Sequence, residues 1–439
     1  MVGHVARVSE LRDTVGCQVV RDATNVTYGK GSWPVYIVFD LLAISRQIPN
    51  NLTIQGFMRF LFASLAALML SSCAQPAFQH QAYVWQRQWT PSVSNALSEQ
   101  SASFSGWRVL GLQVVGERQV LASPDLIVLQ KSGKSLRLVV RIEGARLPID
   151  VQSLMLSVNR LIARWRAAKL PIVGIEIDHD CASAALSDYA AWLRQLRGAL
   201  AADLKLSITT LPTWLDSDAL PAVLAAVDES VLQVHAVQPD RLFDAQRALD
   251  WTHNYAKRAP HPFWVALPGY GVRVARSIDG RVAAVDAEGL IDHSGPDGRE
   301  LRADPGHVAE FLAQVPRSAR LQGILWFRLP VQGDRRAWSP STLAAVIAQQ
   351  PLQAEFVAVA RHAANGAFDL SVRNIGNLDA PAPSIVLPAT CRLADGLGRY
   401  RLQREAATLS LHPDNVWLAV GEVARVGWAR CDLALAKKK

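Results

Sequence analysis

Three acidic residues alternate with other side chains in the stretch Val173–Cys181, and they are the clearest candidates for chemistry in the chain. The stretch reads Val-Gly-Ile-Glu-Ile-Asp-His-Asp-Cys and is preceded by apolar residues from Leu170 onward. In a β-strand, Glu176, Asp178 and Asp180 would share one face, about 6–7 Å apart in succession. Carboxylates this close repel one another, so a fold that buries them usually uses them. We therefore predict a catalytic role; the alternative is an exposed edge strand with a solvated acidic face.

Eight short apolar segments follow one another along the chain and are predicted to be strands. They are Ala82–Trp89, Trp107–Val115, Leu136–Ile142, Gly174–Asp180, Lys205–Leu211, Ser230–Val237, Phe263–Leu267 and Gly323–Leu329. Between them, sets such as Leu154, Leu161 and Trp165 have the spacing of one face of a helix. Repeated strand and helix units over roughly 270 residues predict an α/β protein with a (β/α)8 barrel of the TIM type.

In a (β/α)8 barrel the active site lies where the strands end. The candidate substrate-binding residues near the predicted strand ends are Trp214, Gln238, Tyr270, Trp326 and Arg328. Together with the acids and His235 they mix charged, hydrogen-bonding and aromatic groups, which suits a carbohydrate because aromatic side chains offer flat apolar faces. The 13 tryptophans fit either such platforms or a large core. Core packing is the alternative for the aromatic residues, and His235 could equally be a hydrogen-bonded interior histidine.

The pattern changes after Pro351, and residues 74–350 and 351–439 are predicted to form two domains. The second contains alternating segments at Phe356–Ala360, Phe368–Asn374, Ser384–Leu387 and Val423–Ala429, with Asn-Gly and Gly-Asn turn signals between them. This predicts a small β-sandwich-like domain. Within the barrel, the Gly- and Asp-rich segment Arg273–Asp304 predicts a hairpin-like insertion.

A secretion signal is predicted at residues 58–73, where Met58-Arg59-Phe60 precedes the apolar run Leu61–Leu70. The run is too short to cross a bilayer as a helix, which needs about 20 residues. Its ending, Leu-Ser-Ser-Cys, resembles the lipobox of bacterial lipoproteins. The resemblance implies lipidation of Cys73 and, because Ala74 follows, attachment to the outer membrane on its periplasmic face. Residues 1–57 are then expected to be a mis-called extension; the alternative is a cytoplasmic tail before a buried hydrophobic helix.

The remaining composition restricts the classes of ligand. The net charge is +8 and the basic residues are scattered apart from Lys437–Lys439, so we expect a solvated basic surface near anionic lipid or an acidic polymer, and no nucleic-acid partner. No cofactor or metal is expected, because the sequence lacks a phosphate-cradling glycine loop and a zinc-type Cys/His spacing. Cys391 and Cys431 could pair in an oxidising compartment, while Cys181 is expected to be inert packing.

Four of these segments resemble chitinase-like glycoside hydrolases of family eighteen. Gly174–Asp180 resembles that family's fourth-strand signature D-G-x-D-x-D-x-E, with Val173 in the first Asp place. The other matches are Leu206–Thr209 with the fifth strand, Ala266–Gly271 with the seventh-strand G-x-P-x-Y-G and Gly323–Trp326 with the last strand and its cleft-floor tryptophan. The resemblance implies a barrel that acts on a glycan, with Asp180 in the place of the general acid and Asp178 in that of its supporting residue.

Two departures from that family change the expected mechanism. His235 stands about where the family has a tyrosine and no aspartate follows it, which speaks against substrate-assisted hydrolysis. A second carboxylate would then act as nucleophile or base, and Glu143 at the end of the third strand is the candidate. The alternative for Glu143 is a rim residue paired with Arg141 or Arg146.

A further set of segments resembles a bacterial domain family of unknown function. The segments are Ile177–Cys181, Leu211–Leu215, Ala266–Gly271 and Trp326–Pro330. Together these observations predict an envelope lipoprotein, anchored to the membrane by lipid, that binds and hydrolyses an oligosaccharide or carbohydrate polymer. The alternative is a catalytically inactive barrel that binds a polysaccharide or an envelope partner.

Overall fold

The computed structural model describes residues 78–143, 149–235, 241–276, 282–286, 298–363 and 365–431, together with two short strands, β1 (Val5–Arg7) and β2 (Val20–Asp22). The predicted signal segment 58–73, with Cys73, and Gln238 lie outside the described residues. Among the described residues, no helix combines the length and the apolar composition that crossing a membrane requires.

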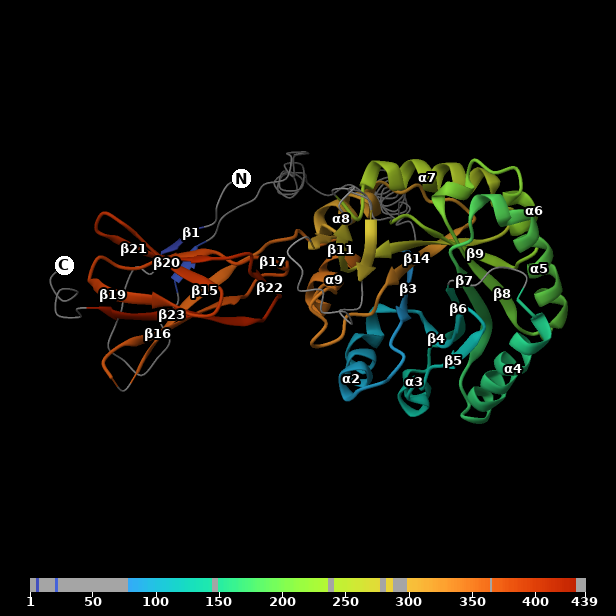
Figure 1. Ribbon diagram of the computed structural model, residues 1–439, viewed down its shortest axis with the longest axis horizontal. Helices are drawn as coiled ribbons and strands as arrows, with labels where there is room; N and C mark the ends of the chain where they lie inside the picture. Colours follow the sequence, from blue (N-terminus) through green and yellow to red (C-terminus); the bar gives the residue numbers. More distant parts are fainter. Residues whose placement is uncertain are drawn as a thin grey trace, which may run out of the picture. The chain divides into compact units, whose positions relative to one another are not determined.

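Eight parallel strands form a closed barrel, which confirms the predicted fold class (Figure 1). They are β3 (Gln79–Val84), β4 (Gly106–Val115), β6 (Ser135–Glu143), β7 (Ile172–His179), β8 (Lys205–Thr210), β9 (Glu229–Gln233), β10 (Phe263–Pro268) and β14 (Leu321–Phe327). The barrel closes because β3 pairs with both β14 and β4. One further strand, β5 (Arg118–Leu121), runs antiparallel to β4.

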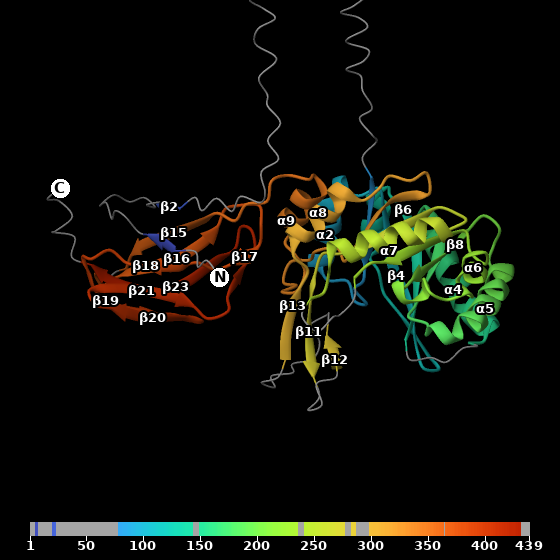
Figure 2. The ribbon, with the colours of Figure 1, turned by 90° about the horizontal axis from the view of Figure 1, so that it is seen from above.

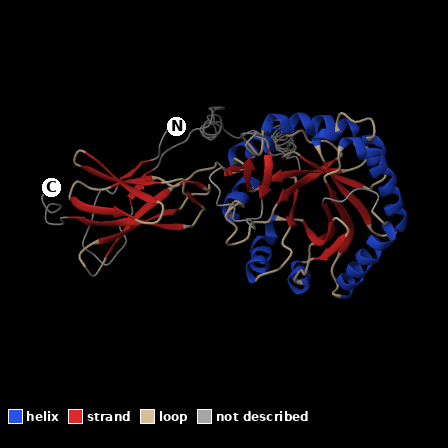
Figure 3. Ribbon diagram, viewed as in Figure 1, coloured by secondary structure: helices blue, strands red, loops and turns tan. Residues whose placement is uncertain are grey.

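Helices surround the strands, as Figure 3 shows. They are α2 (Pro91–Gln100), α3 (Leu126–Ser132), α4 (Val151–Ala167), α5 (Leu186–Ala199), α6 (Leu220–Leu224), α7 (Ala245–Arg258), α8 (Pro305–Gln314) and α9 (Pro340–Ile347). Aspartate side chains cap four of them by accepting hydrogen bonds from first-turn amides, namely Asp125, Asp150, Asp244 and Asp304. These caps mark the end of the barrel at which strands finish and helices begin, here called the mouth.

The sequence of β7 explains its two faces. Ile175 and Ile177 are fully buried, while Glu176 and Asp178 alternate with them and take part in the polar contacts of the barrel interior. The insertion predicted after the seventh barrel strand is a three-stranded sheet of β11 (Gly271–Arg276), β12 (Val282–Asp286) and β13 (Gly298–Arg302). Figure 2 shows these strands projecting past one end of the barrel. In the chain, β11 follows directly after β10.

The C-terminal strands form separate, mainly antiparallel sheets, as expected for residues 351–439. They are β15 (Phe356–His362), β16 (Phe368–Asn374), β17 (Ala380–Pro381), β18 (Ser384–Val386), β19 (Cys391–Gly396), β20 (Tyr400–Glu405), β21 (Thr408–Pro413), β22 (Trp417–Leu418) and β23 (Val423–Cys431). The larger sheets are β19-β23-β16-β15-β2 and β1-β18-β21-β20, and one buried core contains residues of both, such as Val372 and Leu411.

A disulfide joins Cys391 and Cys431, the pair that the sequence left open. It connects β19 to the end of β23, two strands that pair directly. The N-terminal strands β1 and β2 pair with β18 and β15. That residues 1–57 are absent from the mature protein stays a prediction.

Candidate functional site at the barrel mouth

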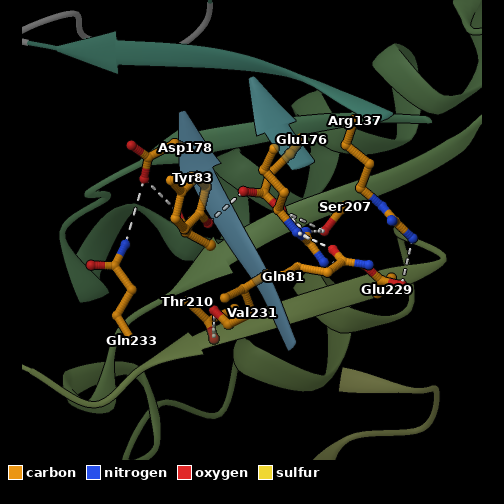
Figure 4. Close-up of polar contacts among 12 residues, drawn as sticks. Gln81, Tyr83, Arg137, Glu176, Asp178, Ser207, Thr210, Glu229, Val231 and Gln233 are labelled. Carbon is orange, nitrogen blue, oxygen red and sulfur yellow. Dashed lines mark hydrogen bonds and ion pairs between the residues drawn. The ribbon is translucent and has the colours of Figure 1, made fainter. Parts of the chain in front are cut away.

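The interior of the barrel below the mouth contains a closed network of charges (Figure 4). Arg108 forms an ion pair with Glu176, and its Nη2 lies 2.8 Å from Oε1 of Glu229. Arg137 Nη2 lies 2.7 Å from the other oxygen of Glu229. The Tyr83 hydroxyl donates to Glu176 Oε1 at 2.5 Å, and the Arg108 guanidinium lies over the ring of Trp264, 5.5 Å from its centroid. Each carboxylate in this layer is therefore compensated by an arginine.

The network accounts for the low pKa of Glu229 and for the position of Glu176. Burial alone would raise the pKa of Glu229, but Arg108 and Arg137 outweigh it and hold that pKa below its ordinary value. Glu176, predicted to be catalytic, is 0% exposed and bound by Arg108, Tyr83 and Ser207. We assign Glu176 to the interior network, because a fully buried and paired carboxylate has no path to a substrate.

Asp178 and Asp180 lie one and two layers further along, at the mouth, and a single arginine holds both. Arg141 Nη1 donates to Asp178 Oδ2 and its Nη2 donates to Asp180 Oδ2, each at 2.9 Å. Asp178 also accepts from the Thr209 hydroxyl at 2.8 Å and from Gln233 Nε2 at 3.5 Å. The structure thus brings together the two acids that the sequence analysis ranked first.

The two carboxylates differ in environment. The side chain of Asp178 is 6% exposed and that of Asp180 is 49% exposed. Burial raises the pKa of Asp178, against the lowering effect of Arg141. The carboxylates oppose the effect of burial on Arg141 and raise its pKa. Asp178 is therefore the more protected group, while Asp180 is open to a ligand.

Aromatic side chains form one wall of the mouth, centred on Phe327. Its ring centroid lies 5.1 Å from those of Trp85 and Tyr270, and 5.7 Å from that of Tyr83. His235 stacks on the same ring at 6.1 Å. Because Trp85, Phe327 and His235 are partly exposed, this wall offers apolar faces to a ligand.

Trp326 and Trp214, predicted to bind the substrate, lie elsewhere. Trp326 is 0% exposed, its indole Nε1 lies 3.0 Å from His80 Nδ1, and its ring is 6.2 Å from that of Trp338. Trp214 is also 0% exposed and donates to the Cys181 carbonyl at 2.8 Å. Both side chains therefore belong to the packing around the strands, which was the alternative to substrate binding for the aromatic residues. Phe327, one residue after Trp326, takes the inward position because side chains alternate along a strand.

His235 is neutral in this setting. Its Nδ1 lies 3.3 Å from the Ala266 carbonyl oxygen, which can only accept a hydrogen bond, so Nδ1 carries the proton and Nε2 is an acceptor. Burial lowers the pKa of His235 to about 4. The side chain is suited to accept a hydrogen bond from a ligand hydroxyl.

Glu143 and Arg328 occupy the rim. Glu143 is exposed and accepts from Gln113 Nε2 at 2.6 Å, and Gln113 in turn accepts from Arg87 Nε at 2.6 Å. Arg328 Nε donates to Asp334 Oδ2 at 3.0 Å, whereas its buried Nη1 has no hydrogen-bond partner within the described parts of the chain. Arg328, predicted to bind the substrate, is therefore paired with Asp334.

Neither a metal centre nor a reactive thiol emerges at this site. The described residues contain no group of three or more His, Cys, Asp or Glu side chains placed to hold a metal ion. Cys181 is buried, and burial raises the pKa of its thiol to about 11. It fits the predicted packing role.

Two segments of the chain match family models. Residues 132–332 match a family described as "Domain of unknown function (DUF3142)", and residues 357–432 match "Domain of unknown function (DUF8456)". No match was found among curated proteins.

Solved structures with a similar chain path include glycoside hydrolases. The spore cortex-lytic enzyme SleL of Bacillus megaterium is 12% identical with a TM-score of 0.46, covering 63% of this chain and 75% of its own. SleL of Bacillus cereus is 14% identical with a TM-score of 0.45 and the same coverage. The GH18 chitinase ChiB of Flavobacterium johnsoniae is 12% identical with a TM-score of 0.42, covering 62% of this chain and 94% of its own.

Proposed function

We propose that the mouth of the barrel binds a carbohydrate chain. The observation that carries this proposal is the Arg141 clamp, which presents Asp178 and Asp180 side by side at the end of β7. Carboxylate oxygens and guanidinium nitrogens are the hydrogen-bonding partners that sugar hydroxyls need.

The aromatic wall lies beside the clamp. Gln233, at the end of β9, donates to Asp178, and His235, two residues later, stacks on Phe327. The same strand end therefore contacts both the acidic and the aromatic part of the mouth. Polar groups on one side and partly exposed rings on the other match the edges and the face of a sugar ring.

A second candidate function is hydrolysis of a glycosidic bond by the two aspartates. It is favoured by their unequal environments, because a buried carboxylate with a raised pKa beside an exposed one can divide the acid and base roles. The positive charge of Arg141 opposes protonation of Asp178, which a general acid requires. We therefore rank glycan binding above glycan hydrolysis as the proposed function.

The replacement Asp180→Asn separates the two functions. It keeps the shape of the side chain but removes a group that can transfer a proton. If the protein hydrolyses a glycan, Asp180→Asn should lose roughly 10²–10⁴-fold in turnover while affinity is kept. Calorimetric binding and product release would be measured on a panel of peptidoglycan fragments and exported polysaccharides. If wild type binds a glycan without turning it over and Asp180→Asn binds it equally well, hydrolysis fails for that glycan. If wild type binds no member of the panel, the binding proposal itself fails for those classes.

We also propose that the protein is exported and held by lipid at the outer membrane, on the periplasmic side. The Cys391–Cys431 disulfide supports an oxidising compartment, and the signal-like segment 58–73 supports export. Intact-mass analysis of protein extracted from membranes should find a lipidated Cys73 at the N-terminus. Peptides from residues 1–57 in the mature protein would contradict this.

A further inference from the structure

The end of the barrel opposite the mouth, where strands begin and helices finish, gathers basic side chains that are scattered along the sequence. We call it the base face. Its eleven lysines and arginines lie between the last turn of a helix and the start of the next strand: Lys131, Lys134, Arg164, Arg166, Lys169, Arg197, Lys205, Lys257, Arg258, Arg317 and Arg320. Nine of them are exposed, and Lys134 and Arg197 are half-buried.

Few acids compensate this charge. In the same described helix-to-strand connections, Asp203 lies 2.6 Å from Arg166, Asp228 lies 3.5 Å from Arg197, and Glu99 is exposed in the last turn of α2. The connections 131–135, 164–172 and 314–321 contain no acidic residue. The base face therefore has a large positive charge, whereas the helix-capping aspartates and the acids of the proposed site lie at the mouth.

Helix stability accounts for part of this pattern. Basic side chains in the last turn of a helix interact favourably with its dipole, which explains residues such as Lys131, Arg164 and Lys257. Arg320 Nη1 donates to the carbonyl of Ala259, which follows α7, at 2.8 Å. Helix stability does not explain Lys134, Lys169 and Lys205, which lie beyond the helix ends or at a strand start. These three positions suit an anionic partner outside the chain.

The chain itself indicates which anionic partner. The first barrel strand, β3, begins at Gln79, and its start lies at the base face because it pairs in parallel with β14 and β4. The predicted lipidation site, Cys73, lies six residues before the strand. Six residues span at most about 22 Å, so a lipid anchor there would be tied by a short connection to the most basic end of the barrel.

We propose that the base face docks on the anionic headgroups of a phospholipid surface. Basic clusters next to a membrane-inserted segment are attracted by anionic lipid, by about 1 kcal/mol for each Lys or Arg near the surface. Docked in this way, the mouth points away from the membrane and is open to a polymer outside it. The inference goes beyond the proposed function; it rests on the proposed lipid anchor and is independent of glycan binding at the mouth.

The test uses the full chain and two triple variants with equal net charge. The first replaces base-face residues beyond the helix ends, Lys134→Gln, Lys169→Gln and Lys205→Gln. The matched control replaces three exposed arginines on the mouth side, Arg118→Gln, Arg299→Gln and Arg335→Gln. Binding is measured by co-sedimentation with phosphatidylcholine vesicles, with and without phosphatidylglycerol, and circular dichroism checks that each variant is folded.

We expect the base-face variant to lose on the order of 10²-fold of the extra affinity that phosphatidylglycerol confers. The control should keep that extra affinity, and binding to phosphatidylcholine alone should be equal for all three proteins. Equal loss in both variants would mean that net charge alone attracts the protein. Unchanged binding of the base-face variant would mean that the tether acts without this face. Either result overturns the proposal.

Discussion

Arginine and carboxylate meet at two levels of the barrel, in opposite settings. In the interior, Arg108 and Glu176 are both 0% exposed, and Tyr83 and Ser207 complete the shell around the carboxylate. At the mouth, Arg141 is 22% exposed and holds Asp180, whose side chain is 49% exposed. Glu176 and Asp180 come from the same acidic row, four residues apart.

The difference shows what makes an ion pair a candidate for function. A sealed pair has no coordination position left for a ligand, and its charges are retained because each compensates the other. An open pair keeps part of its hydrogen-bonding capacity in water, where a ligand can replace the water. The three acids therefore differ in kind. Glu176 is structural, Asp178 is a buried carboxylate between the interior network and the mouth, and Asp180 is exposed.

The largest expected effect follows from removing the arginine at each level. Arg108→Met leaves Glu176 buried without its positive partner and should cost about 3–5 kcal/mol in the free energy of unfolding, or prevent folding. Arg141→Met should cost about 1–2 kcal/mol, because Asp180 is solvated and Asp178 keeps its bond from Thr209. Denaturant unfolding of both variants measures the difference. Equal losses would show that the mouth pair is as structural as the interior one.

Phe327 and Trp326 allow the second comparison, because neighbours in sequence face opposite sides of β14. Trp326→Ala removes a fully buried ring and should cost about 3 kcal/mol of stability while leaving glycan affinity nearly unchanged. Phe327→Ala should weaken glycan binding about tenfold, with a smaller loss of stability, because it removes the ring at the centre of the aromatic wall. Calorimetry and thermal unfolding give both quantities. If Trp326→Ala loses more glycan affinity than Phe327→Ala, the ring that contacts the glycan is Trp326 and not Phe327.

The sequence predicted the eight strands and the direction of the acidic row because both depend on local alternation. It placed Trp326 at the mouth by resemblance, although strand parity gives Phe327 the inward position in this chain. Side chains alternate along a strand, so the face on which a residue lies depends on where the strand begins. Strand boundaries are the least certain feature of a predicted strand.

The interior network could not be predicted from any local pattern. Glu176 and Glu229 lie 68 and 121 residues after Arg108 along the chain. The three side chains meet because the barrel closes. The sequence feature that could have indicated this network is a charged residue inside an apolar run, as for Arg108 and Arg137. The same holds for the base face, whose residues gather because each helix ends at the same level of the barrel.

Acid provides the smallest and most selective test of the comparison between interior and mouth. The pKa of His235 is lowered to about 4 by burial, so the unfolded chain, with an ordinary pKa of 6.5, binds more protons between these values. Stability from His235 is therefore complete above pH 6.5 and is lost as pH falls toward 4. His80, also lowered to about 4, and His179, lowered by burial, act in the same direction. Glu229, whose pKa is held low by its arginines, loses its contribution only below its ordinary value of 4.5.

The replacement His235→Phe keeps a ring against Phe327 and removes one of the three titrating histidines. Between pH 6.5 and 4.5, wild type should lose stability, with about 1–2 kcal/mol of the loss due to His235, and His235→Phe should lose correspondingly less. Below about pH 4 the two proteins should lose further stability in parallel, because His235 is then protonated in both states and the interior network is the same in both proteins. Denaturant unfolding at a series of pH values measures both windows. If the further loss below pH 4 differs between the two proteins while their losses above pH 4 are equal, the mouth and the interior titrate as one unit, and the separation between a sealed and an open level of the barrel does not hold.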